Sequence, residues 1–259
     1  MTKLALSAAV LLLSSLLAVS SSASSVEDFD LFLFVQQWAG SLCDSKKGCC
    51  FQNPEKPPAP EFGIHGLWPQ YAQCRPAAGD DGTAAAAFNI LGSTGTVGKT
   101  KKKCWPENCD KKDKLDLLQI KDLLAALERD WPTLSCKNGA TNMDFWGHEW
   151  QKHGTCSAFD QHRYFQRSLE LKAAHNLTAV LAEAGIVPSD SATYFLSAVK
   201  DAIRGATGSD AIVECNRNTA GEAQLYQVYL CVARDGSGLV DCPEPLLRNC
   251  ADKIKFPTF

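Results

Sequence analysis

Twelve cysteines, an even number, lie between Cys43 and Cys250 of this 259-residue chain. The segment before them, MTKLALSAAVLLLSSLLAVSSSASS, has one early lysine, a short leucine-rich run and then small residues, as secretory signal peptides do. We expect a signal peptide over residues 1–25, with cleavage after Ala23 or Ser25. In the oxidising compartment that this implies, the cysteines should form disulfides rather than remain free thiols, although spacing alone leaves their pairing open.

What remains, residues 26–259, is long enough for one domain with a sizeable core. No second apolar run approaches membrane length, so no membrane partner is expected. The composition changes clearly once, over residues 75–103, where Gly, Ala, Thr and Ser replace any apolar period. We predict a surface loop insertion there, closed off if the flanking Cys74 and Cys104 form a bridge.

The spacing of the apolar residues predicts the main elements of this domain. The expected strands are 30–38, 61–69 and the two halves of 223–242, and the expected helices are 114–131, 163–185 and 191–208. Strands and helices mix without a regular βαβ order. We therefore expect an α+β fold, a single disulfide-rich domain with a central antiparallel sheet packed against several helices.

The charge of the chain limits the kinds of partner it can hold. A formal net charge of −3 and a pI near 6.0 give no sign of the basic surface that proteins reading a nucleic-acid duplex usually need. The only basic concentration is KTKKK, residues 99–103, with Lys111 and Lys112 nearby, and we interpret it as a solvated loop. A nucleic acid would therefore have to be held locally.

The segment FWGHEWQKHGTC gathers ionisable side chains within a dozen positions. If residues 146–153 are helical, a rotation of about 100° per residue puts four of them on one face, within an arc of about 140°. These four are His148, Glu149, Lys152 and His153. A merely solvent-facing helix fits poorly, because two of the five histidines stand here among tryptophans and a phenylalanine. The set suits general acid and base catalysis with a cationic clamp on a phosphate-like transition state.

Acid and base catalysis also needs a second histidine from elsewhere in the chain. GIHGLWP offers His65, between two glycines at the end of an expected strand, although a histidine in such a place is as often structural as catalytic. Zinc is an alternative, but HEWQKH has one residue more than the His-Glu-x-x-His signature, so its histidines point about 140° apart. A Cys156 nucleophile beside His153 is another alternative, and a bridged Cys156 is the favoured interpretation. Neither a metal nor another cofactor is expected.

Taken together, FGIHGLWPQY and FWGHEWQKHGTC resemble the two active-site segments of the ribonuclease T2 family. The surrounding chain is similar to the S-like plant branch of that family, and the likeness extends to FVQQWAGSLC, WPTLSC and the C-terminal ECN, YLCV and DC. It covers nearly the whole mature chain. The resemblance implies that His65 is the general acid and His153 the general base. The resemblance also implies that Glu149 is catalytic and that His148 and Lys152 bind the phosphate. All three would surround the phosphate.

The resemblance also implies where bases bind. Family members use an aromatic just before the second segment and a glutamine in the first strand, matched here by Phe145 and Gln37. Thr133 would lie near this base site, and Trp68 would line the other one. Stacking on an aromatic ring suits unpaired RNA bases and tolerates many sequences. Core packing is the alternative for Phe145, Trp68 and Thr133.

Disulfide pairs carried over from the family are Cys43 with Cys49, Cys50 with Cys136, Cys109 with Cys156, Cys215 with Cys250 and Cys231 with Cys242, which leaves Cys74 for Cys104. An NLT sequon marks Asn176 as a glycosylation site, consistent with secretion. The chain departs from the family in its longer loop at 75–103 and in Gln70, where some members carry an acid. Base preference and substrate access therefore stay open.

These features predict a secreted, monomeric endoribonuclease of the extracellular space or the vacuole. It would cut single-stranded RNA with low base specificity, by transesterification to a 2′,3′-cyclic phosphate. Since neither active segment supplies a convincing nucleophile, the 2′-hydroxyl of the RNA must do so. A storage or defence protein that keeps the fold is the main alternative, and a zinc hydrolase is the second. The five intact residues of the two segments argue against an inactive copy.

Overall fold

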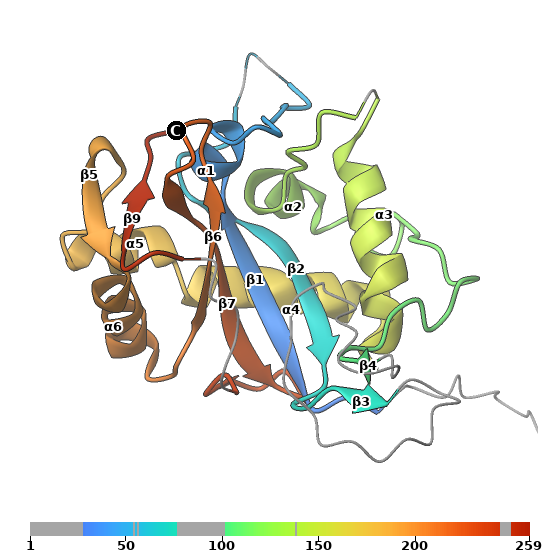
Figure 1. Ribbon diagram of the computed structural model, residues 1–259. Helices are drawn as coiled ribbons and strands as arrows, with labels where there is room; N and C mark the ends of the chain where they lie inside the picture. Colours follow the sequence, from blue (N-terminus) through green and yellow to red (C-terminus); the bar gives the residue numbers. More distant parts are fainter. Residues whose placement is uncertain (1–27, 54, 56, 77–101, 138, 244–249) are drawn as a thin grey trace, which may run out of the picture.

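The computed structural model describes residues 28–53, 55, 57–76, 102–137, 139–243 and 250–259 (Figure 1). The expected signal peptide, most of the insertion and the first three residues of KTKKK lie outside these ranges.

A seven-stranded sheet runs through the described part of the chain (Figure 1). Its main path is β2 (Phe62–Gln70), β1 (Leu31–Trp38), β7 (Ala223–Ala233), β9 (Lys253–Phe256) and β5 (Ser189–Phe195). Two more strands, β6 (Ile212–Arg217) and β8 (Leu239–Val240), also pair with β7. A separate two-stranded ladder joins β3 (Arg75–Pro76) to β4 (Lys102–Lys103).

The expected α+β fold, a single disulfide-rich domain with a sheet packed against several helices, is confirmed, and the sheet is mixed rather than purely antiparallel. Among the described strands every pair is antiparallel except β7 with β9, which run parallel and meet at Gln224 and Lys255. Parallel neighbours cannot be joined by a tight hairpin and need a longer connection. The chain from β7 to β9, residues 234–252, is such a connection and includes β8, and no local sequence pattern shows where it will return.

Helices pack against one face of the sheet. They are α1 (Ala39–Cys43), α2 (Leu124–Asp130), α3 (Asn142–Lys152), a 3₁₀ turn (Gly154–Cys156), α4 (Gln161–Ala174), α5 (Leu177–Glu183) and α6 (Leu196–Thr207). In Figure 1, α4 crosses behind β1 and β2, and its Tyr164 hydroxyl donates to the Leu67 carbonyl of β2 (3.0 Å). Within the described ranges no helix is both long and apolar enough to span a bilayer.

Alternate side chains of β1 face opposite sides of the sheet. Phe32 and Phe34 are fully buried in the main core, under the helices. Leu33 and Val35 face the other side, where they join a smaller apolar cluster with Tyr229. Because the second cluster is small, this side of the sheet also has room for polar side chains.

All the strands expected from the sequence are confirmed, with their ends displaced by one or two residues. The helix of the second active segment is also confirmed, and it begins earlier than expected, at Asn142. Thr141 and Asp144 form a capping box there: the Thr141 hydroxyl accepts from the Asp144 N–H (3.1 Å), and the Asp144 carboxylate accepts from the Thr141 N–H (3.0 Å). This cap fixes the point at which α3 starts.

The helix expected at 114–131 is wrong over its first half, since α2 begins only at Leu124. The side chain of Gln161 accepts from the Asp116 N–H (2.7 Å) and donates to the Lys114 carbonyl (2.8 Å). These backbone groups are thereby satisfied outside a helix. Most of the leucines that suggested a helix still pack against the core, whereas Leu118 is 77% exposed.

Two other helix predictions need correction. The helix expected at 163–185 is divided into α4 and α5, because the Asn176 side chain accepts from the Ala179 N–H (3.1 Å) and caps a new helix. The helix expected at 191–208 is wrong over its first residues, which belong to β5. The threonine and aromatic residues of SATYF favour a strand once a partner lies beside them. That partner is β9, which the sequence did not predict.

Six disulfides join all twelve cysteines, so none is free. They are Cys43–Cys49, Cys50–Cys136, Cys74–Cys104, Cys109–Cys156, Cys215–Cys250 and Cys231–Cys242, the pairs that the resemblance implies. Cys74–Cys104 closes the base of the insertion beside the β3–β4 ladder. Gln70, where some family members carry an acid, is buried at this base and donates to the Cys104 carbonyl (2.8 Å).

Candidate active site

His65 is the extra residue of a β-bulge in β2. Between Ile64 and Gly66 the register with β1 shifts by one, so His65 has no partner opposite. Bulges of this kind re-aim side chains and are frequent next to active sites. The Trp131 indole N–H donates to the His65 carbonyl (2.9 Å) and so ties the bulged backbone to the segment ahead of α3.

The C-terminal half of α3 supplies the other predicted groups. Glu149 lies on the buried side of the helix with 2% of its surface exposed, and His153 ends the helix with 6% exposed. His148 is exposed, and the Lys152 side chain is 35% exposed. The helix therefore places a carboxyl and an imidazole inside the site and two basic groups at its rim.

Trp68 joins the two active segments. Its indole N–H donates to Glu149 Oε2 (2.7 Å), and its ring stacks on His153 with centroids 5.0 Å and planes 24° apart. The ring also meets His65 edge-on, at a centroid distance of 5.0 Å. Trp68, predicted to line a base site, thus stands between the two histidines.

Gly66 allows this junction to form. A Cβ on Gly66 would lie 2.2 Å from Glu149 Oε2 and 2.2 Å from Trp68 Nε1, far closer than non-bonded atoms come. Gly154, directly after His153, has the same role beside Trp150, whose ring carbon would lie 2.1 Å from an added Cβ. Both segments therefore need a glycine next to the histidine that is predicted to be catalytic.

Burial controls the charges of the site. It lowers the pKa of His65 from 6.5 to about 4, with smaller contributions from the nearby His148 and Lys152. Burial, followed by Lys152 and the two other histidines, holds the pKa of His153 well below its usual value. Burial also raises the pKa of Glu149 to about 8, although the hydrogen bond from the indole and the charge of Lys152 lower it. At neutral pH the free protein holds two neutral imidazoles beside a largely protonated carboxyl.

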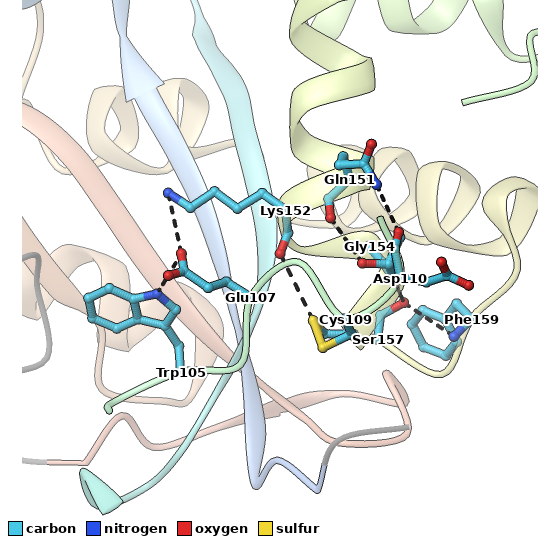
Figure 2. Close-up of a disulfide and its surroundings, with 11 residues drawn as sticks. Trp105, Glu107, Cys109, Asp110, Gln151, Lys152, Gly154, Ser157 and Phe159 are labelled. Carbon is cyan, nitrogen blue, oxygen red and sulfur yellow. Dashed lines mark hydrogen bonds and ion pairs between the residues drawn. A yellow bond between two sulfur atoms is a disulfide. The ribbon is translucent and has the colours of Figure 1, made fainter. Parts of the chain in front are cut away.

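A short segment ahead of α2 is tied to the end of α3 (Figure 2). The Cys109–Cys156 disulfide holds it there, together with a hydrogen bond from the Asn108 N–H to the Lys152 carbonyl (2.9 Å). The segment carries Glu107, whose carboxylate lies 3.9 Å from Lys152 Nζ. Both side chains are partly exposed, so this ion pair contributes less than about 1 kcal/mol, and an entering anion can replace Glu107. The disulfide also removes Cys156 as a nucleophile.

The HEWQKH segment does not direct its two histidines to a common point. His148 is exposed, whereas His153 is buried against Trp68, and the carboxyl between them accepts from the same indole. Across the part of the chain that the structure describes, no group of three or more His, Cys, Asp or Glu side chains is arranged to hold a metal ion.

The other predicted base-binding residues lie at different depths. The partly buried ring of Phe145 is 5.8 Å from the His65 ring. Gln37 of β1 is 6% exposed and stands opposite Gln227 of β7. Thr133, 5% exposed, donates its backbone N–H to the side chain of the first residue of α3 (2.8 Å). The structure thus brings Phe145 next to His65, and Gln37 and Thr133 to neighbouring elements.

Three polar residues that the sequence analysis did not single out stand behind His65. Gln227 Nε2 lies 2.7 Å from His65 Nδ1, and Gln227 Oε1 is 2.7 Å from the Tyr229 hydroxyl, which also bonds to the Glu214 carboxylate. Gln227 and Tyr229 are 3% and 1% exposed. A signal was present: in AQLYQVYLCV, polar groups recur at alternate positions of an otherwise apolar strand.

The predicted glycosylation sequon lies where α5 begins. The Asn176 side chain caps the helix, and the Thr178 hydroxyl accepts from the Phe62 N–H (3.0 Å). Both side chains of the sequon therefore have a structural use, and glycosylation at Asn176 stays a prediction.

A sequence model of the Ribonuclease T2 family matches residues 29–89 and 72–242. "Ribonuclease 1" of Arabidopsis thaliana is 46% identical over 244 residues, which cover 93% of this chain and 92% of that protein. "Intracellular ribonuclease LX" and "Extracellular ribonuclease LE" of Solanum lycopersicum are 41% and 40% identical, over 90% and 91% of this chain and 86% and 90% of their own lengths. A crystal structure of RNase NT in complex with 5′-AMP has a TM-score of 0.74 at 39% identity and covers 90% of this chain and 100% of that one. The likeness thus extends over almost the whole chain.

We expect Gly66→Ala to disrupt the junction at Trp68, because the new Cβ has no room beside Glu149 Oε2 and the indole. The variant should lose about 1–3 kcal/mol of unfolding free energy in urea, as overpacked sites do. Gly147→Ala is the matched control, since a Cβ at this position of α3 would meet nothing within 4 Å. It should gain about 0.5–1 kcal/mol. Equal stabilities for the two variants would contradict the role assigned to Gly66.

Glu149→Gln should change how stability depends on pH. The folded-state pKa of Glu149 is about 8 against an ordinary value of 4.5, so the proton is bound more tightly in the folded protein. The wild-type protein should then lose stability as the pH rises through this window. A glutamine keeps an acceptor for the Trp68 N–H and cannot ionise. Thermal unfolding midpoints should match near about pH 4, below the ordinary pKa, and the variant should unfold at the higher temperature near about pH 9. If both proteins lost thermal stability equally as the pH rises, a group other than Glu149 would be responsible.

Proposed function

This chain belongs to the ribonuclease T2 family, and on that premise we propose that it is an endonuclease that cuts single-stranded RNA by transesterification. The observation that most directly supports this is the position of Trp68, whose ring lies 5.0 Å from the rings of both His65 and His153. Two imidazoles held on one indole are near enough to act on opposite sides of one phosphodiester, and holding the groups in place supplies much of the rate.

His153 is the proposed general base. Since burial keeps it neutral, its lone pair can take the proton of the ribose 2′-hydroxyl while that oxygen attacks the adjacent phosphorus. The bond from the 2′-oxygen to phosphorus forms and the bond from phosphorus to the next 5′-oxygen breaks, which leaves a 2′,3′-cyclic phosphate. His65 is the proposed general acid and gives its proton to the departing 5′-oxygen. Hydrolysis of the cyclic product would use the same transfers in reverse.

A general acid must be protonated, and the low pKa of His65 in the free protein opposes this. A bound phosphodiester places a negative charge beside the imidazole and so raises its pKa. On this account, substrate binding itself charges the acid. The free enzyme and the complex should then differ in their dependence on pH.

Lys152, His148 and Glu149 are the proposed partners of the phosphoryl oxygens. Lys152 can exchange its weak ion pair with Glu107 for the phosphate. Glu149 accepts from Trp68 on one oxygen and can carry a proton on the other, so its raised pKa makes it a hydrogen-bond donor. A cation and fixed donors placed where charge develops stabilise the transition state. We propose that no metal or other cofactor takes part.

We propose that the RNA bases are held by stacking on aromatic rings rather than by base-specific hydrogen bonds. Phe145, whose ring borders His65, would hold one base, with the Gln37 amide and Thr133 close by. Trp68 would line the site of the other base. Stacking is tolerant of sequence and needs an unpaired strand, which supports low base specificity.

We propose that the chain enters the secretory pathway, loses residues 1–25 and works as a monomer of residues 26–259, glycosylated at Asn176. The six disulfides support an oxidising compartment. The two tomato relatives bear the names extracellular and intracellular, so relatives of similar identity differ in destination. Extracellular space is the destination proposed here, with the vacuole as the alternative.

The proposed nucleophile predicts a strict requirement for ribose. The purified protein should cut single-stranded RNA in excess EDTA and release ends with a 2′,3′-cyclic phosphate. An otherwise identical strand with a 2′-deoxynucleotide before one phosphodiester should stay intact at that bond. Comparable cutting of DNA, or activity lost on chelation and restored by zinc, would overturn the mechanism. A folded protein without activity on any RNA would instead support a storage or defence role.

The assigned acid and base predict effects on rate and on pH dependence. His65→Ala and His153→Ala should each lower kcat/KM by about 10²–10⁴-fold. His162→Ala, which removes an exposed histidine paired with Asp122, should leave the rate unchanged. In the wild type, kcat/KM should be greatest on the acid side of neutrality and fall as the pH rises past the pKa of free His65, while kcat should fall at higher pH. Near-normal activity of the His153→Ala variant would exclude it as the base.

A further inference from the structure

A line of hydrogen bonds crosses the sheet from β6 to His65. Glu214 of β6 and Gln227 of β7 are cross-strand neighbours, and Tyr229 lies two residues further along β7 on the same face. The Glu214 carboxylate bonds to the Tyr229 hydroxyl, which bonds to Gln227 Oε1 (2.7 Å), and Gln227 Nε2 lies 2.7 Å from His65 Nδ1. Two side chains, Tyr229 and Gln227, thus connect the Glu214 carboxyl to the imidazole that the proposed function uses as an acid.

Tyr229 has one hydroxyl proton, and it can donate this proton to only one of its two neighbours. If it donates to Gln227 Oε1, its contact with Glu214 requires a protonated carboxyl. The amide N–H of Gln227 then points at His65 Nδ1, which has to be a bare lone pair. In this arrangement both Glu214 and His65 are neutral.

The second arrangement reverses every bond in the line. Tyr229 donates to an ionised Glu214, and the Gln227 amide, turned by half a rotation, donates its N–H to the Tyr229 oxygen. Its own oxygen then accepts from an N–H on His65 Nδ1. A glutamine amide has nearly the same shape in both orientations, so the site accommodates either one. With Nε2 also protonated, His65 is a cation and can give a proton to the departing oxygen.

Resting on the function proposed above, we propose that Glu214 is a positioning residue for the general acid. Through Tyr229 and Gln227, its negative charge holds His65 in the protonated form that the reaction requires. Glu214 itself touches neither the substrate nor the reacting atoms. Its effect is carried by the direction of three hydrogen bonds.

The charges around His65 explain why it needs a negatively charged partner. His65 faces His148, Lys152 and His153, and positive charge on any of them opposes its protonation. Glu149 offers no counter-charge near neutrality, because burial raises its pKa to about 8.

At the other end, Glu214 faces the hydroxyls of Tyr226 and Tyr229 and the charge of Lys47. Partial burial raises the pKa of Glu214 above its usual value, and the hydrogen bond from Tyr229 and the charge of Lys47 offset part of this rise. An ionised Glu214 is therefore supported by a donor and a cation, and it is the carboxylate that hydrogen bonds link to His65.

The test measures the pKa of His65 by NMR, from its imidazole shifts in protein bound to a 2′-deoxydinucleotide that cannot be cut. Glu214→Gln removes the charge at constant size, and Tyr229→Phe interrupts the line at constant shape. Each should lower the pKa of His65 by about one pH unit. The alkaline limb of kcat on RNA should move to lower pH by the same amount. The double variant should show no larger shift than either single one, because each change interrupts the same line.

Two matched controls separate this effect from a loss of packing. Tyr194→Phe removes a hydroxyl that donates to the Val187 carbonyl (2.7 Å), and Glu222→Gln changes an exposed carboxyl that accepts from Asn218 (2.8 Å). Both should leave the pKa of His65 unchanged. If Glu214→Gln does not fold, Tyr229→Phe carries the test alone.

Variants that unfold more easily but keep the wild-type pKa of His65 would overturn the proposal, since Glu214 would then be structural. The NMR measurement does not depend on RNA cleavage. A protein without ribonuclease activity would therefore refute the proposed function, while the pKa of His65 would still show whether Glu214 acts on it.

Discussion

The hydrogen bond from the Trp68 indole to the Glu149 carboxyl is the contact on which the arrangement of the site depends. It joins β2 to α3 and holds a ring that contacts both histidines. Two more indoles connect the same elements: Trp146 of α3 donates to the Trp131 carbonyl (2.8 Å), and Trp131 donates to the carbonyl of His65. Indole N–H groups thus link the helix to the sheet at two positions, Trp146 and Glu149. The Trp68 indole and Glu149 can approach the backbone of β2 this closely because the strand has a glycine at Gly66 and a bulge at His65.

Such a site is costly to fold, because it buries groups that water would solvate. Among the described residues, His153 Nδ1 and Trp150 Nε1 are buried without a hydrogen-bond partner, and each such atom costs about 1–3 kcal/mol. The disulfides offset part of this cost by restricting the unfolded chain. Cys50–Cys136 and Cys109–Cys156 close separations of 86 and 47 residues and attach just before and just after α3. By chain entropy each contributes about 4 kcal/mol. Two of the six crosslinks therefore flank the helix that carries the buried Glu149 and ends at the buried His153.

The active segments could be predicted from the sequence because their chemistry is local: five ionisable residues stand in two short stretches, and helical geometry fixes how four of them relate. Contacts between distant parts of the chain were not predictable in this way. The bulge at His65 depends on the register of β2 with β1, and Gln227 reaches His65 across 162 residues. The same limit explains the wrong helix predictions. Gln161, 45 residues away, bonds to the Asp116 backbone in place of a helical hydrogen bond, and β5 forms only because β9 lies beside it. Apolar spacing predicts what a segment can form, and its distant neighbours decide among the possibilities.

Cys74–Cys104 has a consequence for the covalent integrity of the molecule. The bridge and the β3–β4 ladder hold the two ends of the insertion together, with the two cysteine Cα atoms 4.0 Å apart. Every peptide bond between these cysteines therefore lies inside a closed ring. A protease that cuts there would produce two fragments that still migrate as one molecule until a reductant is added. The strand that carries His65 would come to lie on one fragment and the helix that ends at His153 on the other, and Cys74–Cys104 would join the fragments together with Cys50–Cys136.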